Sequence, residues 1–423
     1  MTDRTETVLG VPYRRLWTAA GLSNLADGIV KVALPLIAIR YTDSPALVAG
    51  LAVALTLPWL LFALPAGALA DRLDRRRAML AANTVRAALL AALALATVAG
   101  AGSIWVLYAV ALGIGAAETI YDTSAQSILP QVVPRALLSR ANGRLFAAEL
   151  TANEFVGPPL GGFLVVAGAA LAYAAPAALW LVAIGALLLV RGRFRVERDG
   201  RTTMRADIAE GLRFLWRHRL LRTLAFMVGV SNFATNAVFA VLVLYAVGPA
   251  SAMGLSEPAY GLLLTTTAAG ALVGSLVAER VERRLGRARS LALTVLGSGL
   301  LVGIPALTTD PYLIGVAFFV GGATIALWNV VTVSLRQRVT PDRLLGRLNS
   351  AYRLIAWGTR PLGAAVGGGL AVAFGLRAVF AGMAVLTLSM IVGMTWVTDE
   401  AMDAAERDAG AVGAGPQSSP GPP

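Results

Sequence analysis

Ionisable side chains inside long apolar stretches are the first candidates for chemistry in this 423-residue sequence. Asn24, Asp27 and Lys31 follow one another at spacings of three and four residues, which predicts that they share one face of a helix. Lys31 is the chain's one lysine, and a buried lysine, unlike an arginine, can lose its proton. We therefore predict that Asp27 binds and releases a proton and that Lys31 tunes its proton affinity; a static ion pair is the alternative.

Other charged residues also fall inside apolar stretches, where each is costly and is by default a candidate for function. Glu118 lies in one such stretch, and Glu149 and Glu154 lie in another, so all three join Asp27 and Lys31 as candidates for proton coupling. Mutual neutralisation of neighbouring charges is the alternative interpretation. Candidates for a substrate cavity are the following polar and aromatic residues: Asn24, Asn232, Asn236, Asn329, Trp357 and Arg360.

The residues that are scarce exclude several kinds of site. The sequence has no cysteine and a single histidine, His218, in an arginine-rich loop, so we expect no disulfide, no metal site and no histidine-based catalytic cluster. A phosphate-binding loop needs a Gly-Lys step, whereas the one lysine follows Val30. We expect neither an enzyme nor a bound cofactor.

The elements that must position these residues are membrane helices. Hydrophobic residues make up 57% of the chain and charged residues only 14%, and apolar runs recur that can each cross a hydrocarbon layer of about 30 Å as a helix. The predicted spans are Leu16–Ile39, Ala46–Ala70, Ala78–Ala99, Ser103–Gln126, Ala141–Ala167, Leu171–Val190, Leu220–Val247, Pro258–Ala278, Ser290–Leu307, Tyr312–Val333, Leu348–Phe374 and Ala378–Val397. The sequence therefore predicts an all-α membrane protein with 12 transmembrane helices.

The distribution of basic residues predicts the orientation in the membrane. Between the predicted spans, arginines crowd the loops on one side, whereas the other side holds only Arg40 and Arg377. Basic loops remain in the cytoplasm, so both termini are expected to be cytoplasmic in a multi-pass protein of the cell membrane. This placement also assigns the net charge of +12 to membrane topology, so the expected surroundings are a lipid bilayer and no nucleic acid.

The two halves of the chain are related. Residues 134–142 read PRALLSRAN and residues 341–349 read PDRLLGRLN; Gly161 and Gly162 meet Gly368 and Gly369 at the same offset. Repeated units with an even number of helices keep one orientation, so we predict two parallel six-helix repeats with a substrate site between them near the bilayer midplane.

These observations divide the chain into five segments. The predicted segments are a cytoplasmic N-terminal segment (1–15), an N-terminal six-helix bundle (16–190), a cytoplasmic connector with an amphipathic helix (191–219), a C-terminal six-helix bundle (220–397) and a disordered cytoplasmic tail (398–423).

A basic loop follows the second predicted span and reads GALADRLDRRR from Gly67. It resembles the signature loop between helices two and three of the major facilitator superfamily, a family of transporters, although Asp74 stands where a glycine is usual. The resemblance implies that the loop gates the switch between inward-facing and outward-facing states. The matching residues are Gly67, Asp71, Arg72, Arg75 and Arg76.

Two further segments resemble exporters of this superfamily. GPPLGG, at residues 157–162, is similar to the antiporter motif of helix five, and its matching residues are Gly157, Pro158, Gly161 and Gly162. AEGLRFLW, at residues 209–216, resembles the connector of actinobacterial multidrug pumps and siderophore exporters.

The resemblance implies a monomeric exporter that works by alternating access and couples proton entry to efflux of an amphipathic drug-like or siderophore-like small molecule. Two alternatives remain open at this stage. One keeps the fold but reverses the direction, as an uptake permease, and the other is a polytopic membrane enzyme of lipid metabolism. The sequence does not identify the substrate.

Overall fold

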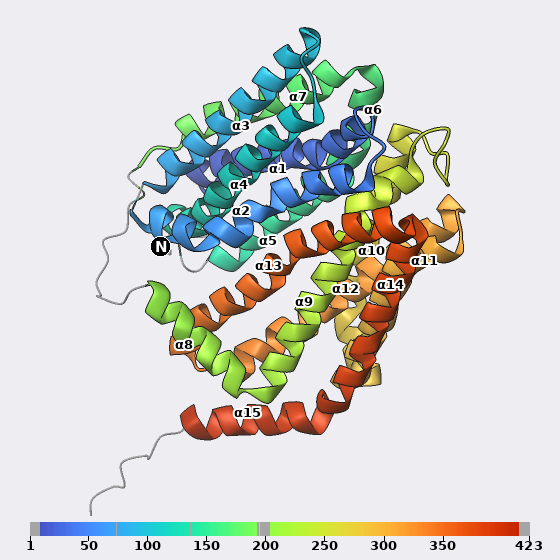
Figure 1. Ribbon diagram of the computed structural model, residues 1–423. Helices are drawn as coiled ribbons and strands as arrows, with labels where there is room; N and C mark the ends of the chain where they lie inside the picture. Colours follow the sequence, from blue (N-terminus) through green and yellow to red (C-terminus); the bar gives the residue numbers. More distant parts are fainter. Residues whose placement is uncertain (1–8, 73, 135–136, 193, 195–203, 414–423) are drawn as a thin grey trace, which may run out of the picture.

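The chain is helical throughout the part that the structure describes. A computed structural model describes residues 9–413 apart from 73, 135–136, 193 and 195–203. For residues 63–72, 139, 204–208, 342–343, 346 and 410–413 it gives the course of the backbone alone. Figure 1 shows two groups of helices, one formed by the N-terminal half and the other by the C-terminal half.

The N-terminal half (N-half) consists of seven α-helical segments and one π-helical segment within the described residues. They are α1 (Val11–Ala38), α2 (Pro45–Arg72), α3 (Arg75–Val98), α4 (Ile104–Val132), α5 (Leu138–Glu149), η3 (Leu150–Val156), α6 (Gly157–Ala167) and α7 (Ala169–Leu188). α5, η3 and α6 follow one another without a break.

The connector contains a helix of its own, and the C-terminal half (C-half) follows it. The elements are α8 (Met204–Arg217), α9 (Arg219–Ala246), α10 (Glu257–Leu285), α11 (Arg287–Leu307), α12 (Pro311–Val339), α13 (Asp342–Phe374), α14 (Leu376–Ser389), the 3-10 segment η4 (Met390–Trp396) and α15 (Asp399–Gly413).

Ten of these helical elements, among the described residues, are long and apolar enough to cross a membrane. The continuous segment Leu138–Ala167 and helix α13 are also long, but charged residues interrupt their apolar character. The length and composition of the helices establish an all-helical membrane fold.

Helix ends follow local chemistry and also reveal the internal repeat. Ser103, Ser256 and Asp310 each cap the N-terminus of the helix that follows by accepting a hydrogen bond from a backbone N–H. Gly168 joins α6 to α7 with a φ of 146°, and Gly375 joins α13 to α14 with a φ of 84°. Glycine adopts such angles readily, and these two residues occupy equivalent positions in the two halves.

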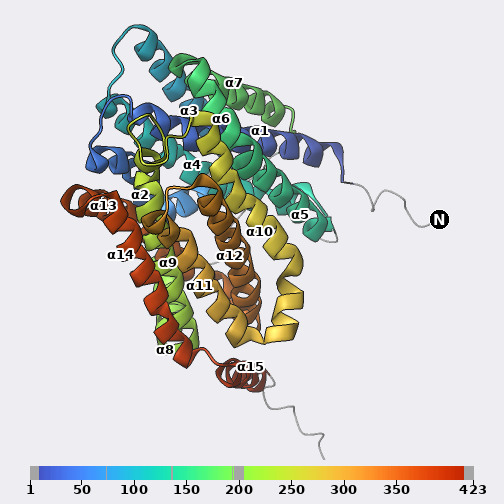
Figure 2. The ribbon, with the colours of Figure 1, turned by 90° about the vertical axis from the view of Figure 1, so that its right-hand side faces the viewer.

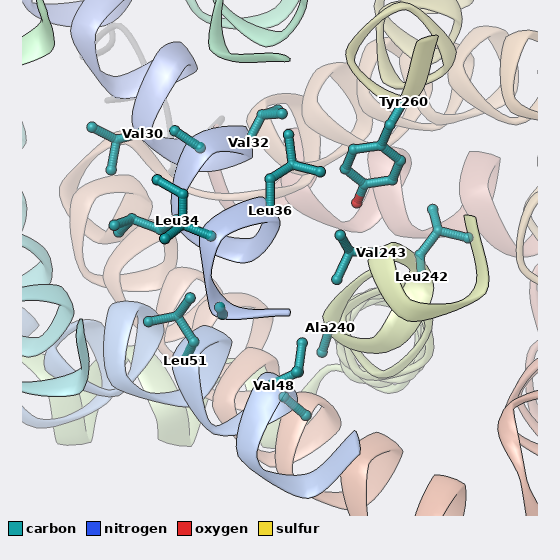
Figure 3. Packing of buried hydrophobic residues seen from close by; sticks show 14 of the residues in the cluster. Val30, Val32, Leu34, Leu36, Val48, Leu51, Ala240, Leu242, Val243 and Tyr260 are labelled. Atoms are coloured by element: carbon teal, nitrogen blue, oxygen red, sulfur yellow. The ribbon is translucent and has the colours of Figure 1, made fainter. Parts of the chain in front are cut away.

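The apolar core is shared at one end of the molecule and divided at the other. A single cluster of buried residues joins both halves; Figure 3 shows side chains of α1, α2, α9 and α10 packed together in it. Toward the opposite end, one cluster contains residues of the N-half alone and another contains residues of the connector and the C-half. We call these the joined end and the split end. The start of α1, α8 and α15 lie at the split end (Figures 1 and 2).

Polar and backbone contacts reinforce the joined end. Arg40, just after α1, forms an ion pair with Glu257 at the start of α10, with 3.1 Å between Nη2 and Oε1. Helix α2 packs on α13, and α6 packs on α10. Because these contacts hold the ends of α1, α2, α6, α10 and α13 together, the two halves diverge from here toward the split end.

The tail differs from the predicted disorder, because residues 399–413 form helix α15. Asp399 accepts hydrogen bonds of 3.0 Å from the backbone N–H groups of Arg287 and Ala288 at the start of α11. Arg287 also pairs with Asp403 and, at 2.6 Å, with Glu406. Met402 and Ala405 of this helix are buried against the C-half, and its acidic residues bind the N-terminus of α11, so contacts with residues distant in sequence order the tail. Residues 414–423 lie outside the described residues.

Replacing Asp399 with alanine should destabilise the C-half. Asp399 supplies the side-chain cap that α11 lacks within its own sequence, and the loss of such a cap costs about 0.5–2 kcal/mol. The thermal unfolding midpoint of the purified protein should fall, whereas replacement of the exposed Glu400 should leave it unchanged. Equal midpoints for Asp399→Ala and the unmodified chain would contradict the capping role.

Candidate functional site

A buried ion pair joins α1 to α3 in the N-half. Arg86 of α3 has no exposed side-chain surface, and its Nη1 lies 3.3 Å from Oδ1 and 3.5 Å from Oδ2 of Asp27 on α1. Nη1 also donates to Ser23 Oγ at 3.4 Å, one helical turn before Asp27. Asp27 therefore interacts with an arginine of the neighbouring helix.

Aromatic rings complete the surroundings of Arg86. Its guanidinium lies 5.1 Å from the ring centre of Tyr121 on α4 and 5.3 Å from that of Trp180 on α7. Its Nε and Nη2 make no hydrogen bond to the described residues. The faces of the two rings attract a cation, so they stabilise the part of the guanidinium that carboxylates do not reach.

More carboxyl groups surround this ion pair than one arginine can neutralise. Glu118 and Asp122 of α4 each interact electrostatically with Arg86 and with Asp27. Glu149, at the end of α5, also interacts with Asp27. The carboxyl groups repel one another, so a proton bound by one of them lowers the electrostatic free energy of the group. We call Asp27, Arg86, Glu118, Asp122 and Glu149 the carboxylate cluster.

The predicted partnership between Lys31 and Asp27 is wrong. Lys31 Nζ lies 2.7 Å from both carboxylate oxygens of Glu154, on η3. Residues four apart in a helix differ in direction by about 40°, and that difference suffices to point Asp27 toward α3 and Lys31 toward η3. The Lys31 and Glu154 side chains are 48% and 41% exposed, so this pair is far more accessible than the Asp27–Arg86 pair.

The π-helical segment that carries Glu154 is a consequence of the prolines that follow it. Pro158 and Pro159 have no N–H to donate, which frees carbonyl groups in the preceding turn. Thr265 of α10 places its hydroxyl 3.4 Å from one of them, the carbonyl oxygen of Phe155. π-Helical segments occur often at functional sites, and this one presents Glu154 to Lys31.

The glycines of GPPLGG bring three helices into close contact. A Cβ on Gly157 would overlap the backbone of Gly28 on α1, and a Cβ on Gly161 would lie 2.8 Å from the carbonyl oxygen of Ile29. Gly162 faces the other way, against the backbone at Glu257 of α10. The motif therefore packs η3 and α6 against α1 in the same half and against α10 in the other half.

The C-half contains a cavity of about 350 Å³ between α9, α11, α12 and α13. Four of the six residues predicted to line a substrate cavity lie together in its wall: Asn232, Asn329, Trp357 and Arg360. The other two are elsewhere. The side-chain amides of Asn24 and Asn236 donate to backbone oxygens of their own helices, at Ala20 and Asn232.

Aromatic and basic side chains join this cavity to the N-half. The ring of Trp357 packs against that of Trp59 on α2, with ring centres 4.1 Å apart and planes tilted by 55°. The Arg360 guanidinium lies 4.5 Å from the centre of the Trp357 ring. Arg353, one helical turn before Trp357, donates a hydrogen bond of 3.1 Å to the side-chain oxygen of Gln126 on α4. Both contacts cross from one half to the other.

The basic loop after α2 is described only in its second part. Gly67, Asp71 and Arg72 belong to the segment whose side chains lie outside the described residues. Arg76 donates to the carbonyl oxygens of Leu187 and Leu188 at the end of α7, both at 2.8 Å.

Arg75 and Asp74 bind the chain just beyond α7. Arg75 donates to the carbonyl oxygen of Phe194 at 3.2 Å, and Asp74 accepts from the Phe194 N–H at 2.9 Å. Asp74 also caps α3, so an aspartate in place of the usual glycine starts the helix well. The arginines satisfy carbonyl groups that the end of α7 leaves free, whereas a gating role remains a prediction.

Sequence reasoning missed several residues of these sites. It did not identify Arg86 as the partner of Asp27, and it did not single out Trp180 or the contact between Trp59 and Trp357. An arginine inside an apolar span was the available signal for Arg86, since such a charge needs a partner on a neighbouring helix.

Comparison with known proteins gives a consistent result. Residues 10–416 match the family model described as transmembrane secretion effector. The chain is 30% identical to the multidrug efflux pump Tap of Mycobacterium tuberculosis over 88% of each protein. It is 29% identical to Tap of Mycolicibacterium fortuitum over 87% of this chain and 91% of that one, and 28% identical to the enterobactin exporter EntS of Salmonella choleraesuis over 85% of each.

Solved structures share the fold. The nucleoside transporter NupG superimposes with a TM-score of 0.73 at 13% identity, covering 91% of this chain and 98% of that one. A bacterial homologue of the iron transporter ferroportin, in an inward-facing state, gives a TM-score of 0.70 at 16% identity with the same coverage. At these identities the likeness concerns the fold alone.

The two ion pairs should differ in their effect on stability. Arg86→Gln leaves Asp27 without its countercharge in the interior, which costs about 3–5 kcal/mol, whereas Lys31→Gln breaks an accessible pair worth about 0–1 kcal/mol. The thermal unfolding midpoint should fall much further for Arg86→Gln. The double variant Asp27→Asn/Arg86→Gln should recover part of the loss, and equal midpoints for the two single variants would refute the distinction.

Proposed function

The chain belongs to the transmembrane secretion effector family of the major facilitator superfamily, and we propose that it is a proton-coupled exporter of an amphipathic small molecule. Members of this family are transporters, so the chain is a multi-pass membrane transporter and not an enzyme of lipid metabolism. The observation that carries the direction of transport is the match, along most of the chain, to relatives named as exporters. Drug-like and siderophore-like compounds are the proposed substrate classes.

The proposed topology has twelve membrane spans. Ten are the long apolar helices of the described residues; the other two are the continuous segment Leu138–Ala167 and α13. Within the described residues, the arginine-rich connections between α2 and α3, α10 and α11, and α12 and α13 border the buried clusters of the split end. This supports a cytoplasmic location for both termini in the cytoplasmic membrane of the cell. One chain contains both halves and is the proposed transporting unit.

The proposed state is inward-facing. If the split end faces the cytoplasm, the shared core and the Arg40–Glu257 pair close the outer side. Alternating access then requires that the contacts of α6 with α10 and of α2 with α13 separate while the split end closes.

The proposed proton site is the carboxylate cluster, with Asp27 as the preferred carrier. Arg86 forms an ion pair with Asp27, and the nearby carboxyl groups of Glu118, Asp122 and Glu149 repel one another, which favours binding of a proton by the cluster. Lys31 and Glu154 form a second, accessible pair between α1 and η3, in which Glu154 can bind a proton, or Lys31 an anionic group of the substrate, in place of its partner.

Expression in a host that lacks its own efflux pumps should lower the accumulation of fluorescent amphipathic dyes. An exporter moves the dye outward, and collapse of the proton gradient by an uncoupler should abolish the difference. The assay compares cells that carry the unmodified gene with cells that carry the vector, for one anionic and one cationic dye. Higher accumulation in the expressing cells would instead indicate an uptake permease.

Asp27→Asn should stop proton-coupled efflux and still permit substrate binding. The amide has nearly the same shape as the acid but carries no exchangeable acidic proton, so the variant can bind substrate without coupling it to proton entry. Proton movement driven by substrate is measured with a pH-sensitive dye enclosed in proteoliposomes. Asn24→Ala, on the same helix and outside both ion pairs, is the matched control. Undiminished proton movement in Asp27→Asn would assign coupling to another group.

A further inference from the structure

The cavity of the C-half has a distinctive charge. Two of the described residues that line it are arginines, Arg353 and Arg360, and none is a carboxylate. Its remaining polar groups are neutral amides and hydroxyls, including those of Asn232, Asn329 and Ser298. A cavity with this lining offers positive charge and hydrogen-bond donors, and it offers no anion to a cationic ligand.

The two arginines are not neutralised in this structure. Within the described residues, neither guanidinium has a carboxylate oxygen at ion-pair distance, 4.0 Å or less. Arg353 donates to the neutral amide of Gln126, and Nε of Arg360 is buried without a hydrogen-bond partner. An unused N–H group on a guanidinium beside a second, exposed arginine can bind an oxyanion.

The nearest carboxylates belong to the N-half. Glu118 and Glu154 act electrostatically on Arg360, and Asp122 acts on Arg353, from across the space between the halves. These carboxylates weaken the positive potential at the two arginines but form no ion pair with either guanidinium in the described residues. An anionic ligand that enters between the halves can therefore reach the arginines directly.

Aromatic surface lies beside the arginines. Arg353 and Arg360 flank the ring of Trp357 at 5.4 and 4.5 Å from its centre, and Trp59 of the N-half covers another part of that ring. Trp328 also lines the cavity. A flat ring can stack on these side chains while a guanidinium binds its acidic group, and a volume of about 350 Å³ suits a small polycyclic compound.

We infer that this cavity is the substrate-binding site for an aromatic organic anion, with Arg353 and Arg360 binding its carboxylate or sulfonate group and Trp357 stacking on its ring. The inference rests on the proposed function as a transporter of amphipathic molecules and narrows the substrate to one charge class. Because Trp357 contacts Trp59 across the halves, a ligand that stacks on Trp357 also alters a contact that changes during alternating access.

Equilibrium binding to the purified full-length chain tests the charge preference. The probes are anthracene-9-carboxylate and 9-(aminomethyl)anthracene, which share a ring system and carry opposite charges at neutral pH. Titration calorimetry should show that the carboxylate binds about tenfold more tightly or better. Equal affinities, or tighter binding of the ammonium compound, would overturn the inference without any variant.

Arginine variants test the location of the site. Arg360→Gln and Arg353→Gln should each weaken binding of the carboxylate by about tenfold, and Arg360→Lys should keep the preference for the anion at reduced affinity. Arg377→Gln, at an exposed arginine of α14, is the matched control and should bind as the unmodified chain does. A carboxylate preference that survives in a folded Arg353→Gln/Arg360→Gln double variant would overturn the assignment to this cavity.

Proteoliposomes separate this inference from the proposed function. Proton movement driven by the carboxylate and not by the ammonium probe supports both. Movement driven by the ammonium probe alone would leave the proton-coupled exporter intact and overturn the anion site. Binding of the carboxylate through Arg353 and Arg360 without any proton movement would support the anion site and refute proton coupling.

Discussion

Arg86 brings a permanent positive charge into the interior of the N-half, and the helices around it are arranged to neutralise that charge. Asp27 approaches from α1, Ser23 accepts a hydrogen bond, and Tyr121 and Trp180 present their rings. Isolated charges in such surroundings cost several kcal/mol, so α1, α3, α4 and α7 can pack together only where these partners meet. The constraint fixes the rotation of α1 about its own axis, and that rotation decides which neighbour the adjoining residue Lys31 meets.

The adjoining part of the α1 surface, about 40° around the helix axis from Asp27, carries the accessible chemistry. With Asp27 directed toward α3, Lys31 meets Glu154 on the π-helical segment, and Gly28 lies against Asn153 and Gly157 between the two ion pairs. The same stretch from η3 to α6 then contacts α10, so a change at Glu154 is only a few residues away from the contact between the halves. This short path from the Lys31–Glu154 pair to the joined end is the route by which we propose that protonation is coupled to the opening of the halves.

The sequence predicted features that depend on local composition and missed those that depend on distant partners. Apolar runs reveal membrane helices because each run is contiguous, and the loop and GPPLGG motifs identified the superfamily. Helical spacing placed Asp27 and Lys31 on one face but could not tell which neighbouring helix each would meet; the partner of Lys31 is 123 positions away. Helix α15 was misjudged for the same reason, since its order depends on Arg287, which lies 112 positions before Asp399.

The divided core has a consequence for the synthesis of the chain. The N-half has its own buried cluster at the split end, from Leu9 to Phe194, and can consolidate it before the C-half has been made. Its apolar residues at the joined end join a cluster that also contains residues of α9 and α10, so that this cluster is complete only when those helices have been made. Assembly therefore passes through a stage in which one half is internally packed and carries an uncovered apolar surface within the bilayer. Mutations at the joined end should then lower the yield of assembled protein and change the packing within each half less.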